Sequence, residues 1–422
     1  MKPALHERSA ADLTAAFRRR ELSPLDATRA ALARIAEMEP KLNAMYRVDR
    51  EGAIEQARAA EARWEDGRPL SRLDGVPLTI KENIHTRGVP APIGTRANED
   101  APLQAADAPP AARVREAGCV ILGKTTMPDF GMLSSGLSSI HGLTRNPWNT
   151  TRNTSGSSSG AGAAAAAGYA PLHLGTDIGG SVRLPATHCG IFALKPSLGR
   201  VPIHPPYIGR VAGPMTRTVE DAALMMNILA RPDARDYMSL PAEDRDFSAD
   251  LERLDPRQLK VGLLPDMGVG LTIDREVRAA AEAAARRARV LPFVAEWCSW
   301  RAARFSGRDV MQAYTLVMAL REAAVAASQP YDFILSPTSP ILPYEAELPC
   351  PGNDPHNALP HIAFTVPFNM SEQPAASVNW NFSANGLPIG VQLVGARFDD
   401  AGVLQLARAI ERLRPAQKPW PE

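Results

Sequence analysis

Residues 153–199 read NTSGSSSGAGAAAAAGYAPLHLGTDIGGSVRLPATHCGIFALKPSLG, and two clusters of small residues in this stretch decide how the chain is interpreted. The first cluster covers 155–162 and the second covers 175–181. Between them, the alanine-rich run 161–167 predicts a helix, and 171–174 predicts a short strand. The second cluster is therefore predicted to be a tight turn at the end of a strand.

This turn is suited to hold a negatively charged oxygen. Two glycines before Ser181 open backbone angles that other residues avoid, and they bring bare N–H groups together. Residues 182–186 can open a helix with Pro185 in its first turn, where a missing N–H costs nothing. A flexible Gly/Ser linker is the plainer alternative, but the apolar, strand-like residues 191–194 follow at once and disfavour it.

Composition points to a protein that acts on a small molecule. The 422 residues include 47 basic and 46 acidic side chains, a formal net charge of +1, and no basic run interleaved with aromatics indicates a nucleic-acid surface. The four cysteines are scattered and show no metal-ligand spacing, so neither a metal nor another cofactor is expected. The sequence shows no signal-type or membrane-spanning apolar run, which favours a cytoplasmic location.

A second segment of interest, residues 75–83, reads GVPLTIKEN and predicts a buried strand that ends at Lys81. Taken alone, a lysine at such a position more often extends its stem to reach the surface. A helix capped by Asp107 and running through Glu116 follows, and then a strand at 119–122. This alternation of strand and helix favours a mostly parallel sheet covered on both faces.

The two small-residue clusters, together with 75–83, resemble the amidase signature family of serine hydrolases, and the resemblance runs from about Ser9 to Glu411. It implies an α/β fold with one large, twisted, mostly parallel mixed β-sheet that helices cover on both faces. A single domain over 1–422 is expected. It would have a signature core at about 75–200, a helical N-terminal segment at 9–64 and a shortened segment around 287–290.

The resemblance also implies roles for individual residues. The family's nucleophile falls on Ser181, its bridging serine, which follows a cis peptide bond, on Ser157, and its base on Lys81. Lysine can act as a base only when neutral, and burial lowers the lysine pKa. We expect a proton to pass from Ser181 through Ser157 to Lys81 during attack, and to return to the leaving amine. The remaining members of the expected site are the backbone N–H groups of Ile178, Gly179, Gly180 and Ser181 as the oxyanion hole, and Ser158 as a supporting residue. Asp177 and Arg183 are expected to support the site by holding the loop through hydrogen bonds or an ion pair, and contact of Arg183 with a substrate carboxylate is the alternative.

The substrate is only loosely constrained by the sequence. Met127, Met132 and Tyr207 are candidate apolar walls, and they favour a small neutral substrate, an aryl or alkyl amide, anilide or carbamate, over a charged amino-acid amide. We expect the small-molecule substrate to be the main partner of the protein. The sequence leaves open whether the chain forms a homodimer.

Three other functions compete with this hypothesis. Residues 156–160 fit the GxSxG elbow of α/β-hydrolases with Ser158 as nucleophile, but the preceding segment is a polar loop rather than the strand that motif requires. The amidotransferase A-type subunit, which works in a complex on tRNA-bound glutamate, would carry a different pattern after Gly199-Arg200. A phosphate-binding loop is disfavoured because no GxxxxGK[ST] is present.

Overall fold

The computed structural model describes residues 4–265, 267, 272–287, 291–292, 307–353 and 359–421. An eleven-stranded sheet runs through it in the order β1-β3-β2-β8-β10-β9-β14-β15-β13-β11-β12. Its strands are β1 (Met45–Val48), β2 (Pro77–Lys81), β3 (Val120–Thr125), β8 (Leu172–Asp177), β9 (Phe192–Lys195), β10 (Val211–Thr216), β11 (Val261–Leu263), β12 (Leu291–Pro292), β13 (Phe333–Pro337), β14 (Ala375–Phe382) and β15 (Pro388–Gly395). Two short hairpins lie outside it: β4 (Leu137–Ser138) with β5 (Gly142–Leu143), and β6 (Arg145–Asn146) with β7 (Asn149–Asn153).

The sheet is mixed, as predicted, and its parallel pairs fall in two groups. β2 pairs in parallel with β3 and β8, and β11 pairs in parallel with β12 and β13. The strands between these groups pair antiparallel, including β8 with β10 and β14 with β15. These antiparallel pairs through the middle of the sheet were not foreseen, because strand direction depends on pairing across long stretches of chain.

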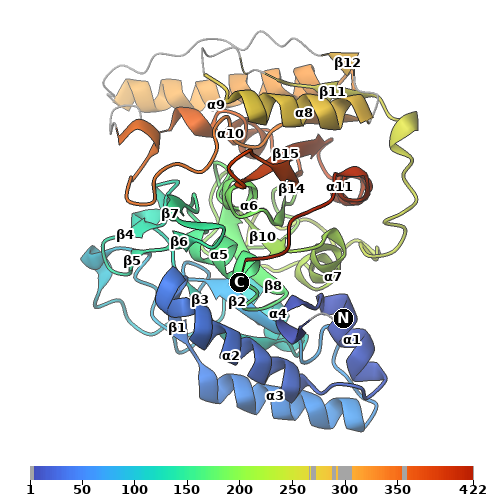
Figure 1. The fold of residues 1–422 in the computed structure, drawn as a ribbon. Helices are drawn as coiled ribbons and strands as arrows, with labels where there is room; N and C mark the ends of the chain where they lie inside the picture. The colour runs from blue at the N-terminus through green and yellow to red at the C-terminus, as the bar shows by residue number, and fades with distance from the viewer. Residues whose placement is uncertain are drawn as a thin grey trace.

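The helices complete the layers on either side of the sheet (Figure 1). They are α1 (Ala10–Arg18), α2 (Pro24–Leu42), α3 (Arg50–Glu65), α4 (Pro109–Glu116), α5 (Ser159–Ala167), α6 (Arg183–Cys189), α7 (Val219–Leu229), α8 (Arg275–Arg287), α9 (Gly307–Ser328), α10 (Val366–Met370) and α11 (Asp400–Leu413). Successive side chains of β3 point to opposite faces of the sheet and so belong to two different hydrophobic cores. Ile121 belongs to the core beneath α1, α4 and α7, whereas Val120 and Leu122 belong to the core beneath α2, α3 and α5. The predicted covering of both faces by helices is therefore confirmed.

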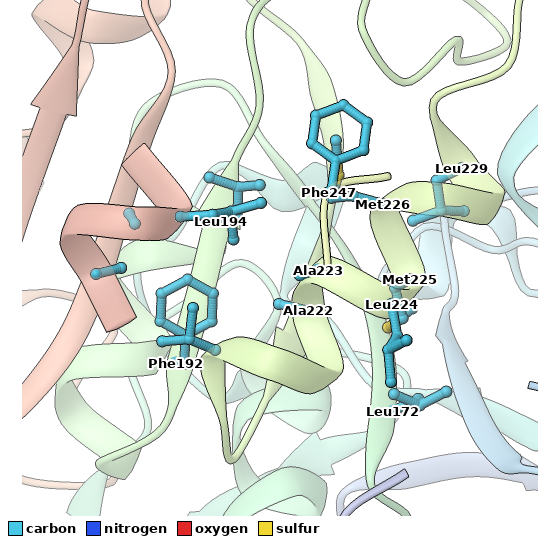
Figure 2. Packing of buried hydrophobic residues seen from close by; sticks show 14 of the residues in the cluster. Leu172, Phe192, Leu194, Ala222, Ala223, Leu224, Met225, Met226, Leu229 and Phe247 are labelled. Carbon is cyan, nitrogen blue, oxygen red and sulfur yellow. The ribbon is translucent and has the colours of Figure 1, made fainter. Parts of the chain in front are cut away.

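The larger core is built where α7 packs on the sheet. Figure 2 shows Ala222 and Leu224 of α7 among Phe192 and Leu194 of β9 and Leu172 of β8, all of them at most 2% exposed. Burial of such side chains typically contributes about 1.5–3 kcal/mol each. This packing holds β8, the strand that leads into the predicted turn.

Most predicted elements are present, with local corrections. Ser23 caps α2 through a reciprocal bond pair with Asp26, and the helix runs past Pro40 to Leu42, within the helical segment predicted at 9–64. Asp107 does not cap α4, because Ala108 is the capping residue and Asp107 instead binds the Arg115 guanidinium.

β8 extends to Asp177, so the turn after it is shorter than the predicted 175–181. The shortened segment predicted around 287–290 falls on 288–290, which lie outside the described residues. The boundaries of a single domain over 1–422 stay a prediction.

Candidate active site

Lys81 lies at the carboxyl end of β2, where the parallel strands β2 and β8 place their last residues at the same edge of the sheet. Its side chain is fully buried, and its Nζ lies 2.9 Å from Ser157 Oγ, 3.0 Å from Ser158 Oγ and 3.0 Å from Thr176 Oγ1. All three of these partners are hydroxyls. Burial lowers the Lys81 pKa well below its ordinary value, and the nearby charge of Arg210 lowers it further.

Two acidic groups oppose this shift of the Lys81 pKa, but each is engaged elsewhere. Asp177 forms an ion pair with Arg183. Glu82 contacts the His141 ring through Oε2 and accepts the Gly94 N–H through Oε1. The position of Lys81 is the dehydrated one that the family resemblance implies for a base.

Ser157 and Ser158 stand at the beginning of α5, the alanine-rich helix predicted from the sequence. The Gly156–Ser157 peptide bond is cis, the feature that the resemblance implies before the bridging serine. Helix α5 is buried along its whole length, and a Cβ on Gly160 would lie 2.2 Å from the Ala44 carbonyl oxygen and 2.5 Å from Thr126 N. Only a glycine permits this close approach, which brings the two serines to Lys81.

The hydroxyls around Lys81 differ in what else they bind. Ser158 Oγ donates to the Thr176 carbonyl oxygen over 3.2 Å, and Asn83 Oδ1 lies 3.3 Å from Thr176 Oγ1, where it can take that proton. Ser157 Oγ has Lys81 Nζ as its hydrogen-bond partner in the described part of the chain. Of the three hydroxyls around Lys81, that of Ser157 is therefore the one with no second partner among the described residues.

Residues 178–181 form the turn between β8 and α6. Gly180 has a φ of +118°, and a Cβ at that position would lie 2.4 Å from Thr365 Oγ1, so glycine is required there. Thr365 Oγ1 in turn donates to the Gly179 carbonyl oxygen over 2.6 Å. Ser181 is partly exposed, and its carbonyl oxygen accepts the Ser158 N–H over 3.2 Å, which ties the turn to the start of α5.

The predicted set of oxyanion donors needs one correction. The Gly180 N–H donates to Asp177 Oδ1 over 2.9 Å and so is already used inside the protein. Among the described residues, the N–H groups of Ile178, Gly179 and Ser181 have no protein acceptor. Three of the four predicted donors thus stay available, because the Asp177 carboxylate turns back into the loop.

Asp177 and Arg183 form a buried network beneath this turn. The ion pair between them measures 3.0 Å, and both side chains are fully buried. Asp177 also accepts the Val182 N–H, while Arg183 donates to Gln392 Oε1 and to the Thr365 carbonyl oxygen. These contacts are the ones expected of residues that hold the loop, and they occupy the faces of Arg183 that a substrate would need.

The three predicted substrate walls lie in different environments. Met127 is fully buried, whereas Met132 and Tyr207 are 68% and 46% exposed. A Cβ on Gly131 would lie 3.2 Å from both Met127 Cε and Ser157 Oγ, so the end of Met127 comes near the bridging serine. Met127 is therefore part of the core beneath the site rather than an exposed wall.

Three polar residues of this site were missed by the sequence interpretation. Thr176 bridges Lys81 and Asn83, and Arg210 Nη2 donates to the Asn83 carbonyl oxygen over 3.2 Å. Thr176 lies in the 175–181 cluster and Asn83 in the 75–83 segment, and their places in these motifs were the only signal in the sequence. Arg210 carried none, since its place follows from the antiparallel register that pairs Val211 with Asp177.

Two further features, a metal-ligand cluster and a membrane-spanning helix, are absent from the described ranges. Within them, no group of three or more His, Cys, Asp or Glu side chains is arranged to hold a metal ion. None of the helices described there has the length and apolarity needed to cross a bilayer.

Comparisons with known proteins give a consistent result. The sequence model of the family described as Amidase matches residues 26–297 and 296–404. The chain is 35% identical to the A-type subunit of the glutamyl-tRNA(Gln) amidotransferase of Myxococcus xanthus, over 95% of this chain and 96% of that protein. It is 31% identical to the acylamidase of Rhodococcus erythropolis, over 97% of this chain and 96% of that protein.

Solved structures resemble the whole fold. A bacterial aryl acylamidase of the amidase signature family superposes with a TM-score of 0.88 and 26% identity, over 97% of this chain and 96% of that one. The 6-aminohexanoate cyclic dimer hydrolase superposes with a TM-score of 0.89 and 26% identity, over 98% of both chains. Full-length similarity of this kind includes both small-residue clusters and the strand before Lys81.

Proposed function

The chain belongs to the amidase signature family and is a hydrolase that acts on amide carbon–nitrogen bonds, and from that premise we propose that it works through an acyl-enzyme on Ser181. In this proposal Lys81 is the base and Ser157 carries the proton between them. The observation that supports it most directly is the 2.9 Å contact between the buried Lys81 Nζ and Ser157 Oγ.

The hydrogen bonds around Lys81 support the direction of proton transfer. A neutral amine has two N–H groups and one lone pair. Ser158 and Thr176 place their own protons on other acceptors and can accept the two N–H groups. The lone pair then faces the Ser157 hydroxyl, which is the arrangement that a general base needs.

The reaction then proceeds in two balanced steps. Ser181 Oγ attacks the amide carbon while its proton moves to Ser157 Oγ and the Ser157 proton moves to Lys81 Nζ. The proton returns by the same route to the leaving nitrogen as the carbon–nitrogen bond breaks, and the amine departs. Water next attacks the ester on Ser181, loses its proton to the same relay, and releases the acid and the free serine.

The turn would stabilise the charge that develops on the carbonyl oxygen. The N–H groups of Ile178, Gly179 and Ser181 are its available donors, since Gly180 is bound to Asp177. Removal of one well-placed donor typically lowers the rate by about 10²–10³-fold.

The finer proposal for the substrate is a small neutral amide, anilide or carbamate with an aryl or alkyl group. It is supported by exposed apolar side chains near the candidate site, because Ile178, Tyr207 and Met132 are 37%, 46% and 68% exposed, and Met132 follows the glycine that approaches Ser157. Ile178 lies within the turn itself, and a Cβ on Gly209 would be 3.5 Å from its Cγ1, so the loop that carries Tyr207 lies beside it. The acylamidase and aryl acylamidase relatives are named for substrates of this class.

The amidotransferase function is kept as a second candidate, because the 35% identity to the Myxococcus xanthus protein is full-length. That function would require partner subunits and glutamine. Release of ammonia from glutamine only after such partners are added, with no hydrolysis of anilides by the isolated chain, would favour it over the proposal.

The deciding experiment is covalent labelling of the purified protein with an uncharged fluorophosphonate, followed by intact-mass analysis and peptide mapping. We expect one label on Ser181 in the wild type and a rate reduced by about 10²–10⁴-fold in Lys81→Met. Lys195→Met is the matched control, because Lys195 is also a buried lysine at a strand end, with its Nζ on the Pro196 carbonyl oxygen. Label on Ser158, or equal rates in the two lysine variants, would overturn the proposal.

A further inference from the structure

Arg210 is a buried cation beside the candidate site that the mechanism above does not use. It is 5% exposed, and it precedes β10 at the point where Val211 pairs with Asp177. This register places Arg210 beside the beginning of the 178–181 turn.

The guanidinium has no acidic partner in the part of the chain that the structure describes. No carboxylate of the described residues lies within ion-pair distance of it. Its Nη1 donates to the Pro205 carbonyl oxygen over 2.8 Å, its Nη2 donates to that of Asn83 over 3.2 Å, and its Nε is buried without an acceptor. The ring of Tyr207 covers it, with 4.9 Å from Cζ to the ring centroid. Burial lowers the pKa of Arg210, as expected for a charge with so little compensation.

A short chain of contacts joins Arg210 to Lys81. Arg210 holds the Asn83 backbone, the Asn83 side chain binds Thr176 Oγ1 over 3.1 Å, and Thr176 Oγ1 lies 3.0 Å from Lys81 Nζ. Every link is a neutral group. The positive charge of Arg210 is therefore connected to Lys81 through polar, partly buried groups that carry no negative charge.

Two acidic groups near Lys81, Asp177 and Glu82, oppose this effect, but each is engaged by another partner. Asp177 is neutralised by its 3.0 Å ion pair with Arg183, and Glu82 is bound to His141 and to a backbone N–H. His85 also lies within the electrostatic influence of Arg210, and burial, Lys124, Arg210 and His204 lower the pKa of that imidazole. Lowering this pKa favours the neutral imidazole, which adds no charge to the site.

Resting on the proposed function, we infer that Arg210 is a positioning residue that keeps Lys81 neutral, and so able to act as the base, in the pH range where the enzyme works. The positive charge of Arg210 disfavours the protonated form of Lys81. Asn83, anchored by Arg210, orients the Thr176 hydroxyl, which accepts one N–H group of Lys81. The inference also favours uncharged substrates, because a carboxylate bound near Arg210 would cancel its charge.

The test is the pH dependence of the second-order rate of Ser181 labelling by an uncharged fluorophosphonate. This rate rises with pH as the base loses its proton. In Arg210→Gln, we expect the rise to move to higher pH, so that the rate at pH 7 falls by about ten-fold while the plateau at high pH stays within about three-fold. In Arg210→Lys, which keeps the charge, the rise should stay close to that of the wild type.

Arg217→Gln is the matched control, because Arg217 is a second buried arginine, 8% exposed, at the other end of β10. Its loss should leave the pH dependence unmoved, and far-UV circular dichroism establishes that each variant is folded. An unchanged profile in folded Arg210→Gln, or an equal loss at every pH, would overturn the inference. A selective loss of activity on carboxylate-bearing substrates in Arg210→Gln would also overturn it. Failure of the proposed function is distinguishable, since it would remove Ser181 labelling from the wild type itself.

Discussion

Asp177→Asn should reveal how much the loop between β8 and α6 depends on one carboxylate. Five N–H groups converge on Asp177: Gly180 N at 2.9 Å, Val182 N at 3.0 Å, Arg183 Nε at 3.1 Å, Arg183 Nη2 at 3.0 Å and Asn369 Nδ2 at 2.9 Å. Both members of the ion pair are fully buried. An asparagine would therefore leave the Arg183 charge unpaired in a dry environment.

The expected loss follows from that geometry. Breaking a buried ion pair by removing one partner costs about 3–5 kcal/mol, because the remaining charge stays desolvated. We therefore expect the free energy of unfolding in urea at pH 7 to fall by about that amount. Labelling of Ser181 should slow by about a hundred-fold, comparable with the loss of one oxyanion donor, since asparagine keeps only one of the two oxygens that anchor the Gly180 and Val182 N–H groups.

The loss of stability caused by Asp177→Asn should depend on pH in a predictable direction. Burial alone would raise the pKa of Asp177, but the Arg183 charge and the hydrogen bonds lower it below its ordinary value. A group whose pKa is lowered by folding stabilises the protein above its unfolded pKa, and that stabilisation is lost as pH falls. The difference between wild type and Asp177→Asn should therefore be full at pH 7 and shrink below about pH 4.

Two further variants make the result interpretable. Adding Arg183→Met to Asp177→Asn removes the unpaired charge and should recover part of the lost stability. Asp255→Asn is the surface control, since its 2.9 Å pair with Arg257 is largely exposed and should contribute little. The reasoning would be refuted by an Asp177→Asn protein with less than about 1 kcal/mol of destabilisation at pH 7, or by a double variant less stable than the single one.

Three other predictions can be checked on the same protein. Ser158→Ala should keep measurable labelling, slowed by about ten-fold through loss of one contact to the lysine, whereas Ser181→Ala should lose labelling entirely. Burial raises the pKa of Asp221 to about 7, so the folded protein must ionise a buried carboxyl as pH rises from about 4 to about 7. Over that range, urea titration should show the free energy of unfolding of the wild type falling by about 4 kcal/mol relative to that of Asp221→Asn. Met127→Ala should cost about 2–5 kcal/mol of stability because Met127 is fully buried, whereas thermal unfolding of Met132→Ala should change little because Met132 is 68% exposed.

Local structure around the site could be predicted from the chain because short-range chemistry governs it. The alanine run predicted α5, and the glycines predicted the turn. Errors arose where a distant partner competes with a local rule. Asp107 is a good capping residue by type, yet the Arg115 guanidinium takes its carboxylate.

Residue chemistry in order along the chain was thus enough to indicate a strand ending in Lys81, a helix over the alanine run that follows the first small-residue cluster, and a glycine turn ending at Ser181. What only the tertiary structure decided is which groups face one another. Arg183 binds Gln392, 209 positions away, and Arg210 lies beside the turn because β10 runs antiparallel to β8. No pattern in a single chain specifies such pairings, because they are set by the packing of segments whose contacts depend on burial and strand register rather than on spacing.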